Sequence, residues 1–280
     1  MSNNTLIQID LEGIIGNKNP KLLKRIPRFI LNWFKRFIHQ DYINEILKKG
    51  HGSEGSEFIQ TVFDELGVKT QSIGSHNIPK SGGCIIAANH PLGGMDGMAM
   101  MLEVSKIRED FLFLANDILL HITPLKKHFL PVNRVGSSDR KSLSLIADAY
   151  NSGKAILIFP SGYVSRKIDG KIQDLPFQKS VIKKSIEHQL PVVPAFIGGQ
   201  NSKRFYLISQ FRKVFGIKLN FEMFTLPDEM FKQRGKTIHI TFGQIISSDS
   251  FKHHTHVSSA ENLRKLIYQL AENPESKYVS

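Results

Sequence analysis

The stretch Ala87-Ala88-Asn89-His90-Pro91-Leu92-Gly93-Gly94-Met95-Asp96-Gly97 joins an apolar segment to a segment of helical composition. The apolar segment, residues 84–88, favours a buried strand, and the residues from Gly97 to Val104 are rich in Met and Ala. Where a strand leads into a helix, free backbone amides and the helix dipole favour negative charge. The junction is therefore a candidate site for stabilising an anion.

The residue types at this junction suit general-base chemistry. The imidazole of His90 can take a proton from a hydroxyl near neutral pH, and the carboxylate of Asp96 can hold the ring in one tautomer. Gly93 and Gly94 can adopt a positive φ, so that amides from Gly93 to Gly97 could point at a developing oxyanion. We predict an acyl-transfer site. Two simpler interpretations stay open, with Asp96 as a helix N-cap and His90 as a loop histidine bonded to backbone.

The same stretch resembles the Asn-His-(four residues)-Asp signature of the glycerolipid acyltransferases, the lysophosphatidic acid acyltransferase family. In this chain five residues, 91–95, separate His90 from Asp96, and we expect the glycine pair to absorb the extra residue as a local bulge. The resemblance implies that His90 is the catalytic base, that Asp96 orients it, and that the loop glycines 93, 94 and 97 lie near the oxyanion.

Three later segments resemble further blocks of that family, in the family's order. The first implies that Arg134 faces the anionic group of the acceptor, and the second that Ser161, Gly162 and Arg166 bind the acceptor. The third implies a Val-Pro step that walls the acyl site. Taken singly, Arg134 could be a surface cation and the third segment a plain buried strand. The segments are Leu130-Pro131-Val132-Asn133-Arg134, Phe159-Pro160-Ser161-Gly162-Tyr163-Val164-Ser165-Arg166 and Pro191-Val192-Val193-Pro194-Ala195-Phe196.

Ser161 stands where typical family members have a glutamate that helps to hold the glycerol-phosphate acceptor. The wording of the blocks is most similar to the bacterial branch that O-acylates lyso-ornithine or lyso-glycine lipid. These acceptors carry a carboxylate, which arginine binds in a bidentate manner. The resemblance therefore implies an O-acyltransferase that acylates the hydroxyl of a lyso-amino-acid lipid. A lysophosphatidic acid acyltransferase of phospholipid synthesis is the alternative.

The resemblance also implies an acyl carrier protein or coenzyme A thioester as co-substrate, a lyso-lipid acceptor and no cofactor. A second class of function stays open, a non-catalytic basic protein that binds lipid or nucleic acid, although we expect no nucleic-acid partner. The sequence contains no Gly-x-Ser-x-Gly elbow, P-loop, dinucleotide-binding glycine motif or cysteine pair. The histidines at 253, 254 and 256 share no helix or strand face, so we expect no metal site.

Composition indicates an ordinary globular protein with a strongly basic balance. The 280 residues are 41% hydrophobic and 22% charged, enough for one sizeable core. Cys84 is the only cysteine, which excludes a disulfide framework and favours a reducing compartment. Residues 1–10 lack the pattern of a signal peptide, and no apolar run approaches the ~18 residues of a membrane span. The net charge of +12 favours an anionic partner, either a membrane surface or nucleic acid.

Residues 26–38 combine an apolar stripe at helical spacing, which includes the only tryptophan, Trp33, with flanking basic residues. This pattern is typical of an interfacial membrane helix, although the stripe could instead face the core. We expect residues 1–52 to form an N-terminal region that consists of a loose lead-in, residues 1–19, and a basic amphipathic membrane-associating helix. Residues 53–280 are expected to form the acyltransferase domain. The protein is expected at the cytoplasmic face of the inner membrane as a peripheral protein, in contact with an anionic membrane surface.

From residue 53 onward the pattern predicts alternating helices and strands. The first helix is expected to begin at an N-cap, Ser53 or Ser56, and to stop at Gly67. Apolar strands separated by amphipathic helices favour an α/β fold, a mixed, mostly parallel sheet covered by helices. The expected strands are 69–74, 84–88, 111–114, 129–132, 155–159, 191–196 and 237–242, and the later helices are 97–106, 138–151, 177–188, 203–215 and 258–272.

Overall fold

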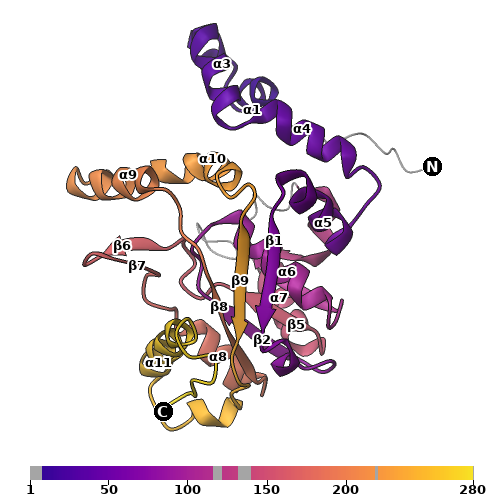
Figure 1. Cartoon of the computed structure of the whole chain (residues 1–280), viewed down its shortest axis with the longest axis vertical. Helices are drawn as coiled ribbons and strands as arrows, with labels where there is room; N and C mark the ends of the chain where they lie inside the picture. The colour runs from indigo at the N-terminus through magenta and orange to yellow at the C-terminus, as the bar shows by residue number, and fades with distance from the viewer. Residues whose placement is uncertain (1–7, 116–121, 132–139, 218–219, 280) are drawn as a thin grey trace.

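The computed structural model describes residues 8–115, 122–131, 140–217 and 220–279. Within these residues the strands form a seven-stranded sheet of order β1-β9-β8-β2-β5-β3-β4 and a two-stranded hairpin, β6-β7. Helices pack on both sides of the large sheet (Figure 1). The strands are β1 (Lys69–Ile73), β2 (Cys84–Ala88), β3 (Phe111–Ala115), β4 (Phe129–Pro131), β5 (Ala155–Ile158), β6 (Arg166–Ile168), β7 (Lys171–Gln173), β8 (Val192–Ile197) and β9 (Thr237–Phe242).

The large sheet is mixed and mostly parallel. Strands β8, β2, β5, β3 and β4 run parallel to one another, whereas β9 is antiparallel to β8 and parallel to β1. The predicted α/β fold class is therefore confirmed, and each predicted strand lies within a residue or two of an observed one. The hairpin β6-β7 was not predicted.

Strand β2 is the centre of the core, because all five of its residues are buried. Cys84, Ile86 and Ala88 pack in one apolar cluster with helices α5 (Gly55–Leu66) and α6 (Gly94–Ser105). Ile85 and Ala87 pack in a second cluster with α8 (Ser180–Glu187) and α11 (His256–Gln269). A strand that is covered on both faces needs a continuous apolar run rather than an alternating one. The sequence of 84–88 meets this requirement.

The α-helices agree with the prediction from residue 53 onward, with α10 as an addition, and α4 is a further unpredicted helix before that point. Helix α5 ends at Gly67, whose φ of 62° is the left-handed conformation expected of a glycine cap. Its N-cap residue is Glu54, not Ser53 or Ser56 as predicted. The α-helices are α1 (Leu11–Lys18), α2 (Pro20–Arg25), α3 (Arg28–Phe37), α4 (Gln40–Lys49), α5 (Gly55–Leu66), α6 (Gly94–Ser105), α7 (Arg140–Asn151), α8 (Ser180–Glu187), α9 (Lys203–Val214), α10 (Leu226–Phe231) and α11 (His256–Gln269).

The N-terminal region differs from the predicted loose lead-in and single basic helix. Helix α1 forms because the Asp10 side chain accepts a hydrogen bond from the Glu12 amide and caps its first turn. Pro27 separates α2 from α3, since the residue before a proline is disfavoured in the helical conformation. Short 3-10 helices complete the described chain, namely η1 (Ser75–Asn77), η3 (Thr123–His128), η4 (Phe221–Thr225) and η5 (Ser248–Phe251).

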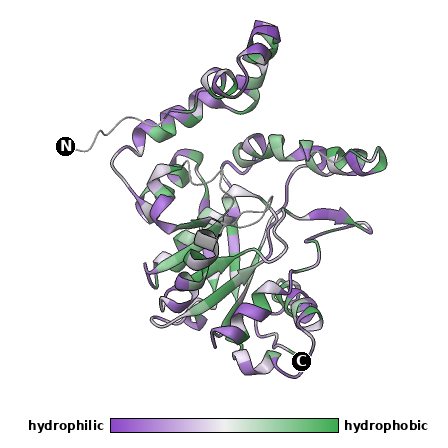
Figure 2. Ribbon diagram, turned by 180° about the vertical axis from the view of Figure 1, so that it is seen from behind, coloured by the Kyte–Doolittle hydropathy of each residue, from purple (hydrophilic) through white to green (hydrophobic). Residues whose placement is uncertain are grey.

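The carboxyl ends of the five parallel strands point to one end of the sheet. Helices α9 and α10 and the N-terminal helices α1, α3 and α4 lie at that end, the upper end in both Figure 1 and Figure 2. Ligand-binding residues of α/β sheets gather at the carboxyl ends of strands, so this end carries the candidate site. None of the described helices has the length and apolar character needed to cross a membrane.

Candidate active site

His90 and Asp96 meet directly after the carboxyl end of β2. The distance from His90 Nδ1 to Asp96 Oδ2 is 2.9 Å, a normal hydrogen bond. The connecting loop reverses because Gly93 adopts φ 85° and ψ −128°, a conformation available essentially to glycine alone. The predicted bulge therefore accommodates the fifth intervening residue. Asp96 lies in the first turn of α6, so the start of that helix presents its carboxylate to the imidazole.

The Asp96 carboxylate is also bonded to the backbone of the loop. Its Oδ2 accepts hydrogen bonds from the amides of Leu92, at 2.7 Å, and Gly93, at 3.0 Å. The side chain is fully buried, and Oδ1 has no hydrogen-bond partner among the described residues. Burial raises the pKa of the Asp96 carboxyl, while His90 and the two amides act in the opposite direction. Asp96 thus both caps α6 and contacts the histidine. The two interpretations of Asp96, as a helix cap and as the partner of His90, are therefore compatible.

The His90 ring lies flat against the ring of Phe159, with centroids 4.0 Å apart and planes 14° apart. Phe159 follows β5 and meets Phe113 of β3 edge to face. The His90 side chain keeps 17% of its surface exposed, which leaves access for a substrate. Because Nδ1 is bonded to Asp96, proton exchange with a substrate would fall to Nε2.

Asp174, which the sequence did not single out, holds the backbone of His90. Its carboxylate accepts the His90 amide at 3.1 Å to Oδ2 and 3.2 Å to Oδ1, and it also accepts the hydroxyls of Ser165 and Tyr268. The Ser165 amide in turn donates to the His90 carbonyl at 2.7 Å. Burial raises the pKa of the Asp174 carboxyl, and the Ser165 hydroxyl and His90 counteract the rise. Both main-chain polar groups of His90 are therefore fixed. The loop after β5 binds the His90 carbonyl, and the loop after β7 binds the His90 amide.

Asn89 anchors the same loop to the neighbouring strand. Its side-chain amide donates to the Ile197 carbonyl at 2.9 Å and accepts the Ile197 amide at 2.7 Å. The buried side chain thus extends the pairing of β2 with β8 by one residue beyond the last strand position. This contact gives a structural reason for the asparagine that precedes the histidine.

The three loop glycines have different environments. Gly93 is the one with a positive φ; Gly94, as the first residue of α6, does not show it, which corrects the expectation for that position. A Cβ at Gly94 would meet no atom within 4 Å, whereas one at Gly97 would lie 3.3 Å from the Phe113 ring. The Gly93 amide is already bonded to Asp96. The first amides of α6 itself, at Gly94 and Met95, lack intrahelical acceptors and remain candidates for an oxyanion.

Of the predicted acceptor-binding residues, Ser161 and Gly162 lie in the loop after β5 and Arg166 begins β6, whereas Arg134 is outside the described residues. Ser161 is buried, and its hydroxyl donates to the Tyr163 carbonyl at 2.9 Å. Gly162 adopts φ 69° in the same turn. The Arg166 guanidinium is buried and bonds to Glu222, at 2.9 Å, and to the Val164 carbonyl. Arg166 therefore already has a carboxylate partner within the protein, a contact that the sequence did not predict.

This chain is similar to known acyltransferases. A family model described as "Acyltransferase" matches residues 13–275. Two proteins named lyso-glycine lipid O-acyltransferase, from Bacteroides thetaiotaomicron and Phocaeicola vulgatus, are each 35% identical over 272 residues, which is 96% of this chain and 100% and 98% of theirs. The crystal structure of the 1-acyl-sn-glycerophosphate (LPA) acyltransferase PlsC from Thermotoga maritima aligns with 90% of this chain and 98% of its own, at 17% identity and a TM-score of 0.48. The resemblance stated from the sequence is confirmed, and this chain belongs to the acyltransferase family.

Proposed function

We propose that this acyltransferase transfers a fatty acyl group from a thioester to the hydroxyl of a lyso-amino-acid lipid, with lyso-glycine lipid as the first candidate acceptor. The observation that carries the proposal is the His90–Asp96 pair, 2.9 Å apart, at the start of α6. A histidine oriented by a buried carboxylate and still accessible to substrate is the arrangement that general-base catalysis requires.

In the proposed reaction, His90 Nε2 takes the proton of the acceptor hydroxyl while the hydroxyl oxygen attacks the thioester carbonyl carbon. The negative charge of the tetrahedral intermediate lies near the first amides of α6, where the helix dipole adds stabilisation. The carbon–sulfur bond then breaks, and the leaving thiolate takes the proton back from the imidazolium. Asp96 favours the imidazolium between these two steps. The scheme needs no cofactor.

The reaction is proposed to proceed without an acyl-enzyme. Cys84, the only cysteine of the chain, is fully buried in β2. Burial raises the pKa of its thiol to about 11, so the nucleophilic thiolate is scarce at neutral pH. Direct attack by the acceptor hydroxyl is therefore the simpler route.

The choice of acceptor rests on two observations. By the resemblance of residues 159–166 to the family's motif, Ser161 stands where phosphate-acceptor enzymes typically have a glutamate, and the two 35% identical relatives are named for lyso-glycine lipid. We infer that Arg134 and Arg166 serve the acceptor carboxylate, Arg134 by direct contact. The Arg166 guanidinium is bonded to Glu222, so we expect it to contribute positive charge near the site rather than a bidentate contact with the acceptor.

We infer that the protein binds as a peripheral protein to the cytoplasmic face of an anionic inner membrane. Helix α3 supports this, because Phe29 and Trp33 are 71% and 56% exposed and Leu31 alone of its residues is buried. The part of the apolar stripe formed by Phe29, Ile30 and Trp33 thus faces solvent, as an interfacial helix requires, whereas Phe34 and Phe37 are half-buried. Exposed basic residues of the same region, among them Arg28 and Arg36, favour anionic lipids.

Acceptor competition tests the proposal. The purified protein is supplied with one acyl thioester and either lyso-glycine lipid or lysophosphatidic acid, and kcat/KM is measured from thiol release. We expect a clear preference for lyso-glycine lipid, and the folded His90→Ala variant should lose at least ~10²-fold in rate. A preference for lysophosphatidic acid would refute the acceptor assignment. Thiol release by His90→Ala within tenfold of wild type would refute the mechanism, and its absence from wild type with every acceptor would favour a non-catalytic binding protein.

A further inference from the structure

Helix α9 and the adjoining η4 present large apolar side chains to solvent. Leu207, Phe211 and Val214 follow one another at helical spacing on α9, and their exposed fractions are 63%, 63% and 81%. The opposite face of α9 is buried through Phe205 and Tyr206, so the exposed stripe is not the face that holds the helix to the protein. We define the α9–η4 patch as Leu207, Phe211, Val214, Phe215, Phe221 and Phe224, all of which are exposed.

The patch is hollowed between its two elements. A groove of about 280 Å³ lies there, lined by Leu207, Ile208, Phe211, Arg212, Ile217 and Phe221. Figure 2 shows hydrophobic segments along α9, which projects from the body of the molecule. Contiguous exposed apolar surface of this kind marks a site of contact with a partner or a membrane.

The charged side chains of α9 itself are all positive. Lys203, Arg204 and Lys213 are exposed on α9. Between residues 203 and 224 the only acidic residue is Glu222, which is fully buried between Arg166 and Arg212. An apolar surface framed by cations complements the headgroups and acyl chains of an anionic bilayer. A second copy of this chain is a poor occupant, because its net charge of +12 would bring like charges together.

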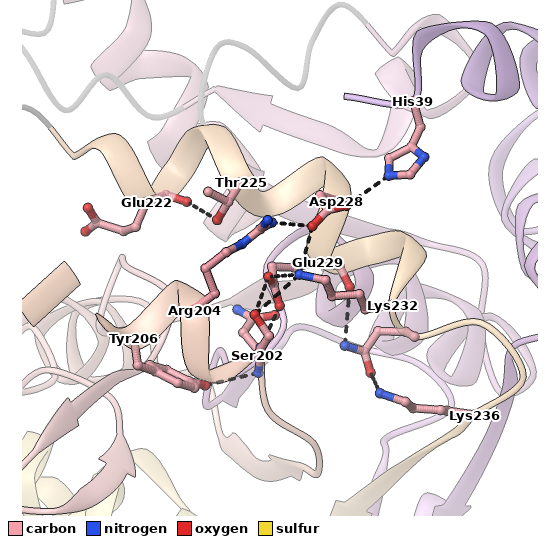
Figure 3. Close-up of polar contacts among 12 residues, drawn as sticks. His39, Ser202, Arg204, Tyr206, Glu222, Thr225, Asp228, Glu229, Lys232 and Lys236 are labelled. Carbon is pink, nitrogen blue, oxygen red and sulfur yellow. Dashed lines mark hydrogen bonds and ion pairs between the residues drawn. The ribbon is translucent and has the colours of Figure 1, made fainter. Parts of the chain in front are cut away.

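Polar contacts hold α9 in place beside the candidate active site. Asp228 of α10 binds both Arg204 of α9 and His39, which precedes α4, and Glu229 of α10 accepts from both the amide and the hydroxyl of Ser202 (Figure 3). The Arg204 guanidinium also lies over the Phe37 ring of α3, 5.3 Å from its centroid. The patch is therefore next to the proposed membrane helix and fixed with respect to it.

The same elements contact the catalytic loop. Leu226 of α10 lies so close to Gly93 that a Cβ there would be 3.1 Å from the leucine side chain. On the other side, Arg166 joins Glu222 of η4 to the segment whose Ser165 amide bonds to His90. A bilayer that covered the patch would thus lie beside the loop that carries His90.

We propose that the α9–η4 patch inserts into the interface of an anionic bilayer, as a second membrane contact in addition to α3. The inference rests on the proposed function only in taking the membrane as the source of the acceptor lipid. Two contacts at the end of the sheet that carries the catalytic loop would fix the orientation of the protein, so that the hydroxyl of a lyso-lipid in the bilayer can reach His90 without leaving the interface. The patch touches lipid, not the reacting atoms.

Vesicle binding by full-length variants tests this inference. In the patch variant, Leu207, Phe211 and Phe215 are replaced together by serine. In the matched control, serine replaces Ile73, Leu145 and Val257, which are similarly exposed but lie outside the patch. Sedimentation with phosphatidylglycerol-containing vesicles and with pure phosphatidylcholine vesicles gives the binding constants. We expect the patch variant to bind anionic vesicles at least about 100-fold more weakly, since a fully buried Leu or Phe contributes about 1.5–3 kcal/mol, or more than tenfold, and partial insertion a fraction of that. The control should bind as wild type does.

A single-residue probe covers the case in which the triple variant fails to fold. Phe215, 61% exposed, is replaced by cysteine and labelled with an environment-sensitive fluorophore, while the native Cys84 is buried. A blue shift on addition of anionic vesicles supports insertion, and an unchanged spectrum overturns the proposal. Three other results would also overturn the proposal. The triple variant could bind vesicles as wild type does, the control could lose binding equally, or the protein could form a dimer that only the patch variant abolishes. Acyltransferase activity measured on detergent-dispersed lyso-lipid reports on the proposed function separately, so either idea can fail while the other stands.

Discussion

Replacing Asp96 by asparagine separates its two roles. The amide oxygen of asparagine can occupy the place of Oδ2 and accept from Leu92, Gly93 and His90, and the amide nitrogen would replace Oδ1, which has no partner among the described residues. The cap of α6 and the ring orientation are thus kept, and what is lost is the negative charge beside the imidazolium. Asp96→Asn should therefore melt near the wild-type temperature yet turn over slowly.

The size of the loss follows from the geometry of the pair. A charge-assisted hydrogen bond exceeds a neutral one by about 1–1.5 kcal/mol, which sets a lower limit of about tenfold in rate. Two unit charges about 4 Å apart at an effective dielectric constant near 20 interact by about 4 kcal/mol, which sets an upper limit of about 10³-fold. The expected decrease in kcat lies between these limits and below that of His90→Ala, which removes the base itself.

The assay is thiol release from an acyl thioester with lyso-glycine lipid, followed across pH for wild type, Asp96→Asn and Asp96→Ala. Asp96→Ala is the comparison for capping, because it also deprives the amides of Leu92 and Gly93 of their acceptor and should lower the melting temperature. If folded Asp96→Asn keeps the wild-type rate and pH profile, Asp96 serves as a helix cap and the proposed pairing in catalysis is wrong.

Three further predictions follow from the same structure. Cys84→Ala should keep the wild-type rate, and iodoacetamide should leave the native enzyme active, because the pKa of this buried thiol is raised to about 11; inactivation that tracks labelling of Cys84 would contradict direct attack. Because burial raises the pKa of Asp174, its ionisation opposes folding as pH rises. The unfolding free energy of Asp174→Asn minus that of wild type should therefore increase in denaturant titrations as the pH rises above about 4, the ordinary pKa of an aspartate, and a decrease would reverse the assigned direction. Glutamine at four exposed N-terminal cations should weaken low-salt binding to anionic vesicles about several-hundredfold, at about 1 kcal/mol each, and binding indifferent to the changes would leave α3 without a membrane role; the four are Lys24, Arg25, Arg28 and Arg36.

The parts of the fold that the sequence predicted are those dictated by local chemistry. The apolar segments 84–88 and 155–159 are long enough and apolar enough to be covered on both faces, and each forms a central strand. The hairpin β6-β7 was missed because its strands are three residues long and polar. Its turn nevertheless carries a signal, the pair Asp169-Gly170, whose φ values of 48° and 79° are both positive, as an Asp-Gly hairpin turn requires.

The candidate site divides in the same way. His90 and Asp96 were found because they lie six positions apart across one turn. Residues so close in the sequence are also close in space. Asp174 lies 84 positions from His90, and Glu222 lies 56 positions from Arg166. Such contacts depend on how the chain returns to the sheet, and nothing in the local residue pattern encodes them. Arg166 therefore had the residue type of an acceptor-binding cation, but its internal carboxylate partner emerged only from the structure.

The catalytic loop is fixed by side chains that bind backbone, and this arrangement bears on catalysis. Asn89 ties the loop to β8, Asp174 holds the His90 amide, and Asp96 holds the next two free amides. Each anchor is buried, so its hydrogen bonds are expensive to break. A histidine held in this way needs little reorganisation when charge develops on it, which is the condition under which a fixed carboxylate and helix amides stabilise a transition state most effectively. The imidazole is therefore positioned jointly by four residues, Asn89, Gly93, Asp96 and Asp174. A change in any of them should affect the rate through the position of the imidazole.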